Sequence, residues 1–227
     1  MRNAGANSTV DNLVQSAGTV QTVHVKNVMP EANSFWVLYG QHTEPTYLDD
    51  AGDGQQLQRN TALRHVKQWR VCLDIGSNIG QWTRPLAKRF ESVVCFEPNP
   101  NFRECFQKNI PENNVVLWPV GLSDKEHKAK QDFNSTVLQN EDGDVYCRTL
   151  DSFALTNVDF VKIDVDGFEI PLLQGAEETL TMNNPVINIE MKESKRSDIV
   201  SRSKQILENY GYKFRSRTKS DEVWMKS

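Results

Sequence analysis

The residues with the clearest chemical content are two glycines that follow an acid at the end of a short apolar run. Asp74 ends that run, and Gly76 and Gly80 come after it, four residues apart. This order predicts a buried strand, a tight turn and the start of a helix. Because glycine has no side chain, a ligand can approach the backbone of such a turn closely. Open α/β sheets bind ligands at the carboxyl ends of their strands, so the segment predicts a ligand site.

A second acid narrows the choice of ligand. Glu97 ends the next predicted strand, where a carboxylate can accept hydrogen bonds from both hydroxyls of a ribose. The turn has Asn78 between its glycines and lacks the third glycine of a dinucleotide-binding turn. Asp74 would repel a pyrophosphate but would suit an amino group. S-adenosylmethionine, with a ribose, an ammonium group and no phosphate, fits better than NAD. The alternative is a strand, turn and helix that bind nothing.

Three more acids lie where later strands end. Asp164 and Asp166 belong to the end of a strand predicted over 158–165, and Glu190 to the end of one over 185–191. Asp164, with Glu190 beside it, could act as a general base on a substrate hydroxyl. Together with Asp166 they could instead hold Mg²⁺ through oxygen ligands. Two alternatives stay open: Asp166 could serve only the turn, or Asp-x-Asp could mark a metal-dependent glycosyltransferase.

Strands alternate with helices from Arg70 onward, and these elements must position the acids. The alternation predicts an α/β fold with a mainly parallel sheet. The predicted strands are 70–75, 92–97, 114–120, 158–165 and 185–191, followed by an antiparallel pair at 212–215 and 222–225. The predicted helices are 79–89, one capped by Asn99 before Pro100, one opened by Pro171, and 197–209. An extended excursion is predicted over 126–148 and a short helical turn over 149–153.

The first part of the chain differs in character from the rest. Residues 1–18 are rich in small and polar types and predict a mobile leader. Residues 19–28 and 34–39 have strand character, and Asn60 could cap a helix that runs to Gln68. We therefore expect an N-terminal extension over 1–69 and one domain over 70–227.

Charge and cysteine usage limit the partners. The 227 residues carry a net charge of −4, which gives no global attraction to nucleic acid or to membranes. Residues 192–227 hold ten Lys/Arg against five Asp/Glu, or +5, so the remainder carries −9. Their basic residues Lys213, Arg215, Arg217 and Lys219 could share one strand face and meet an anionic substrate such as RNA, although a solvated surface is the simpler interpretation.

Neither metal spacing nor a targeting segment appears in the sequence. The cysteines Cys72, Cys95, Cys105 and Cys147 have no CxxC pair and predict small core residues in a reduced, cytoplasmic protein. We expect no signal peptide and no membrane span. The oligomeric state is not predicted.

A set of motifs, in their order and spacing, resembles the FkbM-type methyltransferases, which depend on S-adenosylmethionine. The matching pieces are LDIGSNIGQ (73–81), FEPNP (96–100), GLSD (121–124), TLDSF (149–153), VKIDVDGFE (161–169), LLQGA (172–176) and INIEM (187–191). Asp166 stands where this family more often has Glu. The resemblance covers about 70–212 and leaves residues 1–69 unmatched.

The resemblance implies a class I methyltransferase fold, a Rossmann-like sandwich around a seven-stranded sheet whose last strand is antiparallel. It also implies methyl transfer to oxygen, commonly a hydroxyl of a sugar or a natural product. The turn would hold the methionine part of the cofactor, Glu97 would take the ribose, and Asp164 would point to the reaction centre. The expected cofactor-binding residues are Asp74, Gly76, Ser77, Asn78, Gly80, Glu97, Pro98, Asn99 and, near the adenine, Gly121, Leu122 and Ser123.

Overall fold

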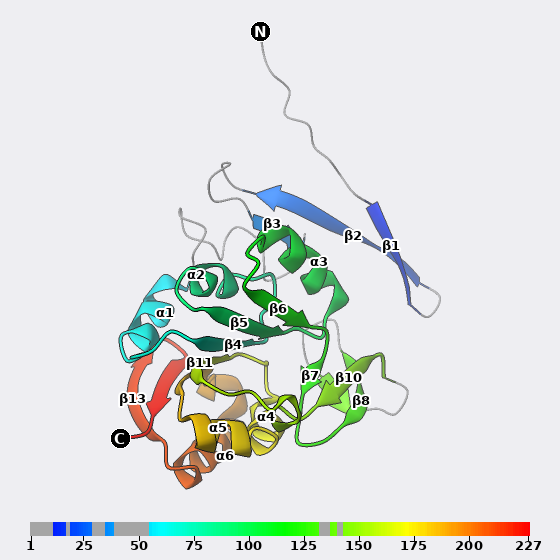
Figure 1. The fold of residues 1–227 in the computed structure, drawn as a ribbon. Coiled ribbons are helices and arrows are strands. Elements are labelled where there is room, and N and C mark those ends of the chain that lie inside the picture. Colours follow the sequence, from blue (N-terminus) through cyan, green and yellow to red (C-terminus); the bar gives the residue numbers. More distant parts are fainter. Residues whose placement is uncertain (1–10, 17–18, 29–34, 39–54, 132–136, 140–142) are drawn as a thin grey trace.

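A seven-stranded sheet forms the centre of the computed structural model (Figure 1), which describes residues 11–16, 19–28, 35–38, 55–131, 137–139 and 143–227. Its strand order is β13-β14-β12-β11-β4-β5-β6. The strands are β4 (Val71–Ile75), β5 (Ser92–Phe96), β6 (Val115–Trp118), β11 (Val158–Ile163), β12 (Val186–Glu190), β13 (Lys213–Thr218) and β14 (Asp221–Met225). β14 pairs antiparallel with both β12 and β13 and so runs opposite to the other six strands, which confirms the predicted class I methyltransferase topology.

Helices cover both faces of the sheet. They are α1 (Gln56–Leu63), α2 (Thr83–Ala87), α3 (Pro100–Asn109), α4 (Glu169–Gln174), α5 (Glu177–Asn183) and α6 (Glu193–Asn209). Figure 1 shows α2 and α3 on the face opposite α4, α5 and α6. Each face has its own apolar core, because successive strand residues point to opposite sides: Cys72 packs with the helices of one face and Leu73 with those of the other.

Two predicted helices are shorter than expected. We predicted a helix over 79–89 with Pro85 awkwardly inside it, but α2 begins only at Thr83. Pro85 then lies in the first turn, where backbone N–H groups have no partner within the helix. The helix that we expected Pro171 to open begins at Glu169 and is broken into α4 and α5 around Gly175. A Cβ atom on Gly175 would lie 1.9 Å from the carbonyl oxygen of Ser123, so the chain passes too close for a side chain there.

The expected cap at Asn60 is wrong, because Asn60 lies inside α1. The cap at Asn99 is confirmed: its side chain accepts a hydrogen bond from the N–H of Asn101 at 2.9 Å. All four cysteines are free and buried, in agreement with their predicted core role.

Two smaller sheets accompany the main one. The excursion over 126–148 contains β8 (His127–Gln131), β9 (Val137–Gln139) and β10 (Val145–Arg148), which form a four-stranded sheet with β7 (Gly121–Leu122). The turn predicted over 149–153 is the 3₁₀ helix η2 (Asp151–Phe153).

The N-terminal sheet consists of β1 (Asp11–Ser16), β2 (Thr19–Val28) and β3 (Phe35–Leu38). Residues 11–16 of the predicted leader form β1, while 1–10 and 17–18 lie outside the described residues. Within the described ranges, no helix is long and apolar enough to cross a bilayer.

Candidate active site

The carboxyl ends of four adjacent strands bring the predicted acids together. The sheet order β12-β11-β4-β5 places the strand ends side by side, with Ile189, Ile163, Ile75 and Phe96 in successive registers. The residue after each of these positions is, in the same order, Glu190, Asp164, Gly76 and Glu97. Residues far apart in sequence therefore share one edge of the sheet, where ligands bind in open α/β folds.

The glycine turn is packed tightly between β5 and β11. Gly76 has a φ of +74° and Gly80 a φ of +93°, conformations that L side chains rarely adopt. A Cβ atom on Gly76 would lie 1.9 Å from the carbonyl oxygen of Asp164. The N–H groups of Gly76 and Ser77 donate to the carbonyl of Phe96 at 3.0 and 3.2 Å. Only glycine at position 76 allows the turn to approach both strands.

Glu97 lies beneath the turn with both carboxylate oxygens engaged. It accepts hydrogen bonds from the N–H groups of Asn78 and Asn99, each at 2.8 Å. Its side chain is buried, and burial raises the pKa of Glu97 to about 7 against the opposing effect of these two N–H donors. A carboxylate has about four acceptor positions, so two would remain for the hydroxyls of a ribose.

Asp74 is placed differently from what we expected of a residue facing a cationic ligand. It is fully buried, and its neighbours are the Thr83 hydroxyl at 2.6 Å and the Lys162 ammonium at 3.4 Å. The cation beside Asp74 in the structure is therefore a lysine of β11.

Lys162 connects the glycine turn to the acid that follows it. Its ammonium donates to the carbonyl of Gly76 at 2.6 Å and lies 3.4 Å from Asp74 and 3.9 Å from Asp164. The lysine side chain is buried, so these neighbours are its compensation for leaving water. We assigned it no role from the sequence, although a lysine within an apolar strand is an unusual residue that signals a paired charge.

Asp164, Asp166 and Glu190 form one cluster. Each offers a carboxylate oxygen, and these oxygens lie within 4.8 Å of one another. Burial, together with the charge of Asp164, raises the pKa of Glu190 to about 8. The ammonium of Lys192 lies 2.7 Å from Glu190 and 3.5 Å from Asp166, so a cation from the chain itself already borders the cluster.

The C-terminal hairpin adds groups that we did not predict. Ser220 donates to Glu190 at 3.3 Å, and Asp221 accepts from the Asn188 amide at 2.8 Å. Burial raises the pKa of Asp221 to about 6. No local sequence pattern predicts that these residues lie near the cluster, because the pairing of β12 with β14 brings them there.

The residues expected near an adenine lie in the small sheet or directly after its strand β7. Gly121 and Leu122 form β7, which pairs in parallel with β10, and the buried Ser123 donates its N–H to the carbonyl of Arg148 at 2.8 Å. Pro98 and Asn99 lie between β5 and α3, next to Glu97.

Known proteins resemble the chain in sequence and in fold. A family model described as the methyltransferase FkbM domain matches residues 74–214, well over half of the chain. No curated protein matches the chain in sequence. The methyltransferase FkbM from Methylobacillus flagellatus KT superposes with a TM-score of 0.54 and 17% identity, over 70% of this chain and 44% of that protein. The chain thus spans less than half the length of this relative.

A second solved structure, SMU.1697c, a proposed methyltransferase from Streptococcus mutans in complex with SAH, gives a TM-score of 0.50 and 10% identity. It covers 75% of this chain and 94% of that one. At such identities these two likenesses establish the fold alone.

Proposed function

This chain belongs to the FkbM methyltransferase family, and we propose that it transfers the methyl group of S-adenosylmethionine to a hydroxyl oxygen of a sugar or another small natural product. Dependence on S-adenosylmethionine follows from the family, and the acceptor is the proposed part. The observation that carries the proposal is the position of Asp164, whose backbone contacts the glycine turn and whose side chain lies at the same strand edge.

The residues at the strand edge fit the cofactor. The Ser77 hydroxyl in the turn is buried and has no hydrogen-bond partner, and Glu97 keeps acceptor positions for a ribose. When bound, S-adenosylmethionine supplies an electrophilic methyl group on a positively charged sulfur. The turn and Glu97 would hold it, with Lys162 fixing the turn through the carbonyl of Gly76.

The chain then has two tasks toward the acceptor. It must align the hydroxyl with the methyl group, and such positioning corresponds to an effective concentration of about 10⁵–10⁸ M. It must also remove the hydroxyl proton, which we assign to the Asp164 carboxylate, with Glu190 as its neighbour. Both acids lie at the cluster described above.

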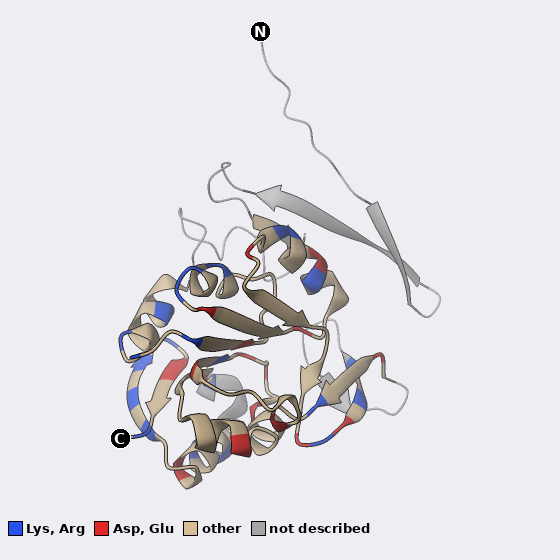
Figure 2. Cartoon of the chain, viewed as in Figure 1, with Lys and Arg blue, Asp and Glu red and all other residues tan. Residues whose placement is uncertain are grey.

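RNA is the second candidate acceptor. β13 exposes Lys213, Arg215 and Arg217 along one edge of the sheet (Figure 2), and Arg217 reaches the carbonyl of Met191 at 3.1 Å, next to Glu190. Binding of RNA at this edge should weaken steeply with added salt. Binding that does not change with salt would exclude it. The family assignment leaves the glycosyltransferase interpretation of Asp-x-Asp without support.

Cofactor binding and its pH dependence test the site. We expect calorimetry to show S-adenosylmethionine binding that strengthens as pH rises through about 7, because ionised Glu97 accepts hydroxyl hydrogen bonds more strongly. Glu97→Gln should bind more weakly and lose this dependence. The amino group of the cofactor titrates in a similar pH range, so any pH dependence that remains in Glu97→Gln is that of the cofactor and not of Glu97.

Glu97 also makes the stability of the fold depend on pH, in the direction opposite to cofactor binding. Because folding raises the pKa of Glu97, its contribution to stability is present at low pH and is lost as pH rises from about 4.5 to about 7. Glu97→Gln should remove that loss in urea titrations. No cofactor binding by the folded wild-type protein would overturn the assignment of the site.

Removal of metal tests whether the acid cluster uses the ammonium of Lys192 or a bound Mg²⁺ as its cation. Lys192 already lies against Glu190 and Asp166, and we propose that its ammonium serves there, with Mg²⁺ on Asp164, Asp166 and Glu190 as the alternative. We expect methyl transfer to survive dialysis against EDTA and to fall in Lys192→Met. Activity that is lost in EDTA and restored by Mg²⁺ would establish the alternative.

A further inference from the structure

The last residue of α3 connects two parts of the molecule that lie far apart in the sequence. Asn109 is buried, and its side-chain amide makes three hydrogen bonds. The amide oxygen accepts from the N–H of Trp36 at 2.6 Å, and the amide nitrogen donates to the carbonyl of Trp36 at 3.0 Å. The same nitrogen donates to the carbonyl of Ile79 at 2.8 Å. One amide therefore holds both the N-terminal strand β3 and the glycine turn.

The amide of Asn109 can serve these three groups in one orientation only. Its oxygen is the atom that can accept from an N–H group, and its nitrogen has two hydrogens, one for each of the two carbonyls. The turn, the end of α3 and β3 must therefore keep fixed positions relative to one another. If β3 moved away, the amide would lose two of its three hydrogen bonds and would be free to rotate away from Ile79 as well.

The side chain of Asn109 takes the place of a further strand beside β3. β3 is the last strand of its sheet, and Trp36 is paired with Asn27 of β2 in antiparallel register. In such a pair the N–H and C=O groups of one residue point to the same side of the strand. Those of Trp36 both meet the amide of Asn109, which pairs with them as a backbone peptide group would.

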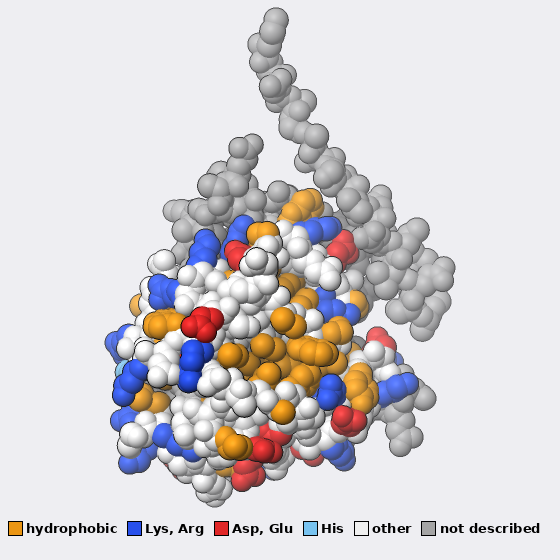
Figure 3. All heavy atoms as spheres, in the orientation of Figure 1, with side chains coloured by type: hydrophobic (Ala, Val, Ile, Leu, Met, Phe, Trp, Pro, Cys, Tyr) orange, Lys and Arg blue, Asp and Glu red, His pale blue; other side chains and the backbone are white. Residues whose placement is uncertain are grey.

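Aromatic side chains of β3 dock the strand on α2 and α3. Phe35 is buried, and the guanidinium of Arg84 in α2 lies 4.8 Å from the centroid of its ring. The ammonium of Lys108 in α3 lies 4.8 Å from the centroid of the Trp36 ring. Figure 1 shows β3 beside these two helices, and Figure 3 shows blue and orange side chains next to one another on this upper part of the described surface. β3 is thus a docked element with its own contacts.

The glycine turn meets the end of α3 at two points. The first is the carbonyl of Ile79, which the amide of Asn109 holds. The second is Gly80, where an added Cβ atom would lie 2.7 Å from the Cδ1 atom of Ile110, the residue that follows Asn109. A change at the end of α3 is therefore felt directly by the turn.

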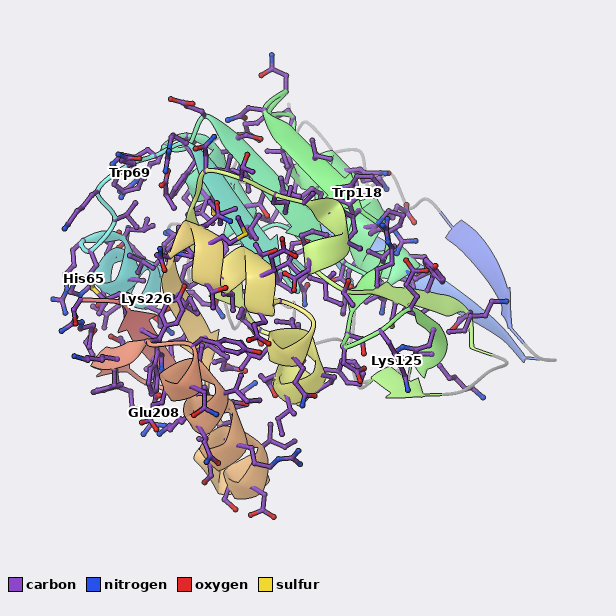
Figure 4. All side chains as sticks on the ribbon, turned by 60° about the horizontal axis from the view of Figure 1, so that its bottom comes forward. His65, Trp69, Trp118, Lys125, Glu208 and Lys226 are labelled. Carbon is purple, nitrogen blue, oxygen red and sulfur yellow. The ribbon has the colours of Figure 1, made fainter. Side chains whose placement is uncertain are left out.

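The location of the N-terminal sheet agrees with this link. Figure 4 labels Trp69, which lies shortly before β4, and Trp118, the last residue of β6, on opposite sides of the molecule. The blue N-terminal strands lie on the side of Trp118. Because β4 and β6 run in the same direction, the turn that follows β4 belongs to that side too.

We propose that Asn109 is a positioning residue of the cofactor site, which couples the docking of β3 to the binding of S-adenosylmethionine. The proposal rests on the function proposed above, in which the glycine turn holds the cofactor. A docked β3 keeps the amide in place, and the amide keeps the carbonyl of Ile79 in place, so the turn is preformed for the cofactor. Because coupling between two binding equilibria is reciprocal, bound cofactor must also stabilise the docked β3. β3 precedes the residues that the family model matches, and it thereby becomes part of the catalytic unit.

Hydrogen exchange followed by mass spectrometry tests the coupling. In the wild-type protein we expect saturating S-adenosylmethionine to slow exchange at the backbone amides of 35–38 as well as at those of the turn, because local opening of β3 becomes less favourable. In Asn109→Leu the amides of the turn should still be slowed, and those of 35–38 should not. Slowing at the turn alone in the wild-type protein would overturn the proposal. Slowing at 35–38 that persists in Asn109→Leu would do the same.

Cofactor affinity gives a second measurement, made by calorimetry. We expect Asn109→Leu to bind S-adenosylmethionine about tenfold more weakly, the effect of about one lost hydrogen bond to the turn. Phe35→Ala should also weaken binding, because it removes an aromatic ring that docks β3 on α2. Gln107→Leu is the matched control, since it replaces an exposed amide of the same helix, and it should leave the affinity unchanged.

Far-UV circular dichroism shows whether each variant folds. If Asn109→Leu does not fold, Phe35→Ala and the exchange experiment on the wild-type protein still decide the matter. Unchanged affinity in folded Asn109→Leu, or an equal loss in Gln107→Leu, would overturn the link while the cofactor site stands. A folded wild-type protein that binds no cofactor would overturn the cofactor site itself, and the link with it.

Discussion

Replacing Asp164 by alanine is expected to lower kcat for methyl transfer by about 10²- to 10⁴-fold, the usual contribution of a general base. Affinity for S-adenosylmethionine should persist, because the contact of Asp164 with the glycine turn is made by its backbone carbonyl, which alanine retains. The measurement is transfer of a labelled methyl group to an acceptor found by screening sugars and small hydroxyl compounds. Calorimetry on the same preparation gives the cofactor affinity.

The matched control is Asp144→Ala, which removes an exposed acid just before β10. It should leave both kcat and cofactor affinity unchanged. If Asp164→Ala lost cofactor binding together with activity, the carboxylate would be part of the cofactor site and its assignment as the base would fail. If its kcat matched that of Asp144→Ala, another group would be removing the proton.

Replacing Lys162 by methionine is expected to lower the free energy of unfolding by about 3–5 kcal/mol, the cost of removing one partner of a buried ion pair. Asp74 is fully buried, and Lys162 is the cation beside it in the structure. The variant should also bind S-adenosylmethionine more weakly, because the hydrogen bond to the carbonyl of Gly76 is lost. Urea unfolding followed by circular dichroism measures the first effect and calorimetry the second.

Two further variants separate the buried pair from a general effect of losing a lysine. Lys213→Met, at an exposed position of β13, should leave stability unchanged. Asp74→Asn combined with Lys162→Met should be more stable than the sum of the two single losses predicts, since neighbouring charges couple. Additive losses would mean that Lys162 does not compensate Asp74.

Local sequence determined the elements that depend on neighbours along the chain. The glycines at 76 and 80 predicted the turn, because glycine has no Cβ atom and so tolerates the positive φ angles that both positions adopt. Asn99 before Pro100 predicted the start of α3 for the same kind of reason, since a cap bonds only to residues next to it. The apolar runs predicted which strands end in acids, and so predicted Asp164, Glu97 and Glu190 as site candidates.

Tertiary structure decided what these residues touch. Asp74 looked like a ligand for a cation, but the pairing of β4 with β11 gives it Lys162, 88 positions away in the chain. The break between α4 and α5 depends on the backbone of Ser123, and the groups around Glu190 depend on the pairing of β12 with β14. The periodicity of apolar residues predicts which side chains are buried. The side chain that each buried residue contacts depends on the strand order, which comes from packing the whole sheet.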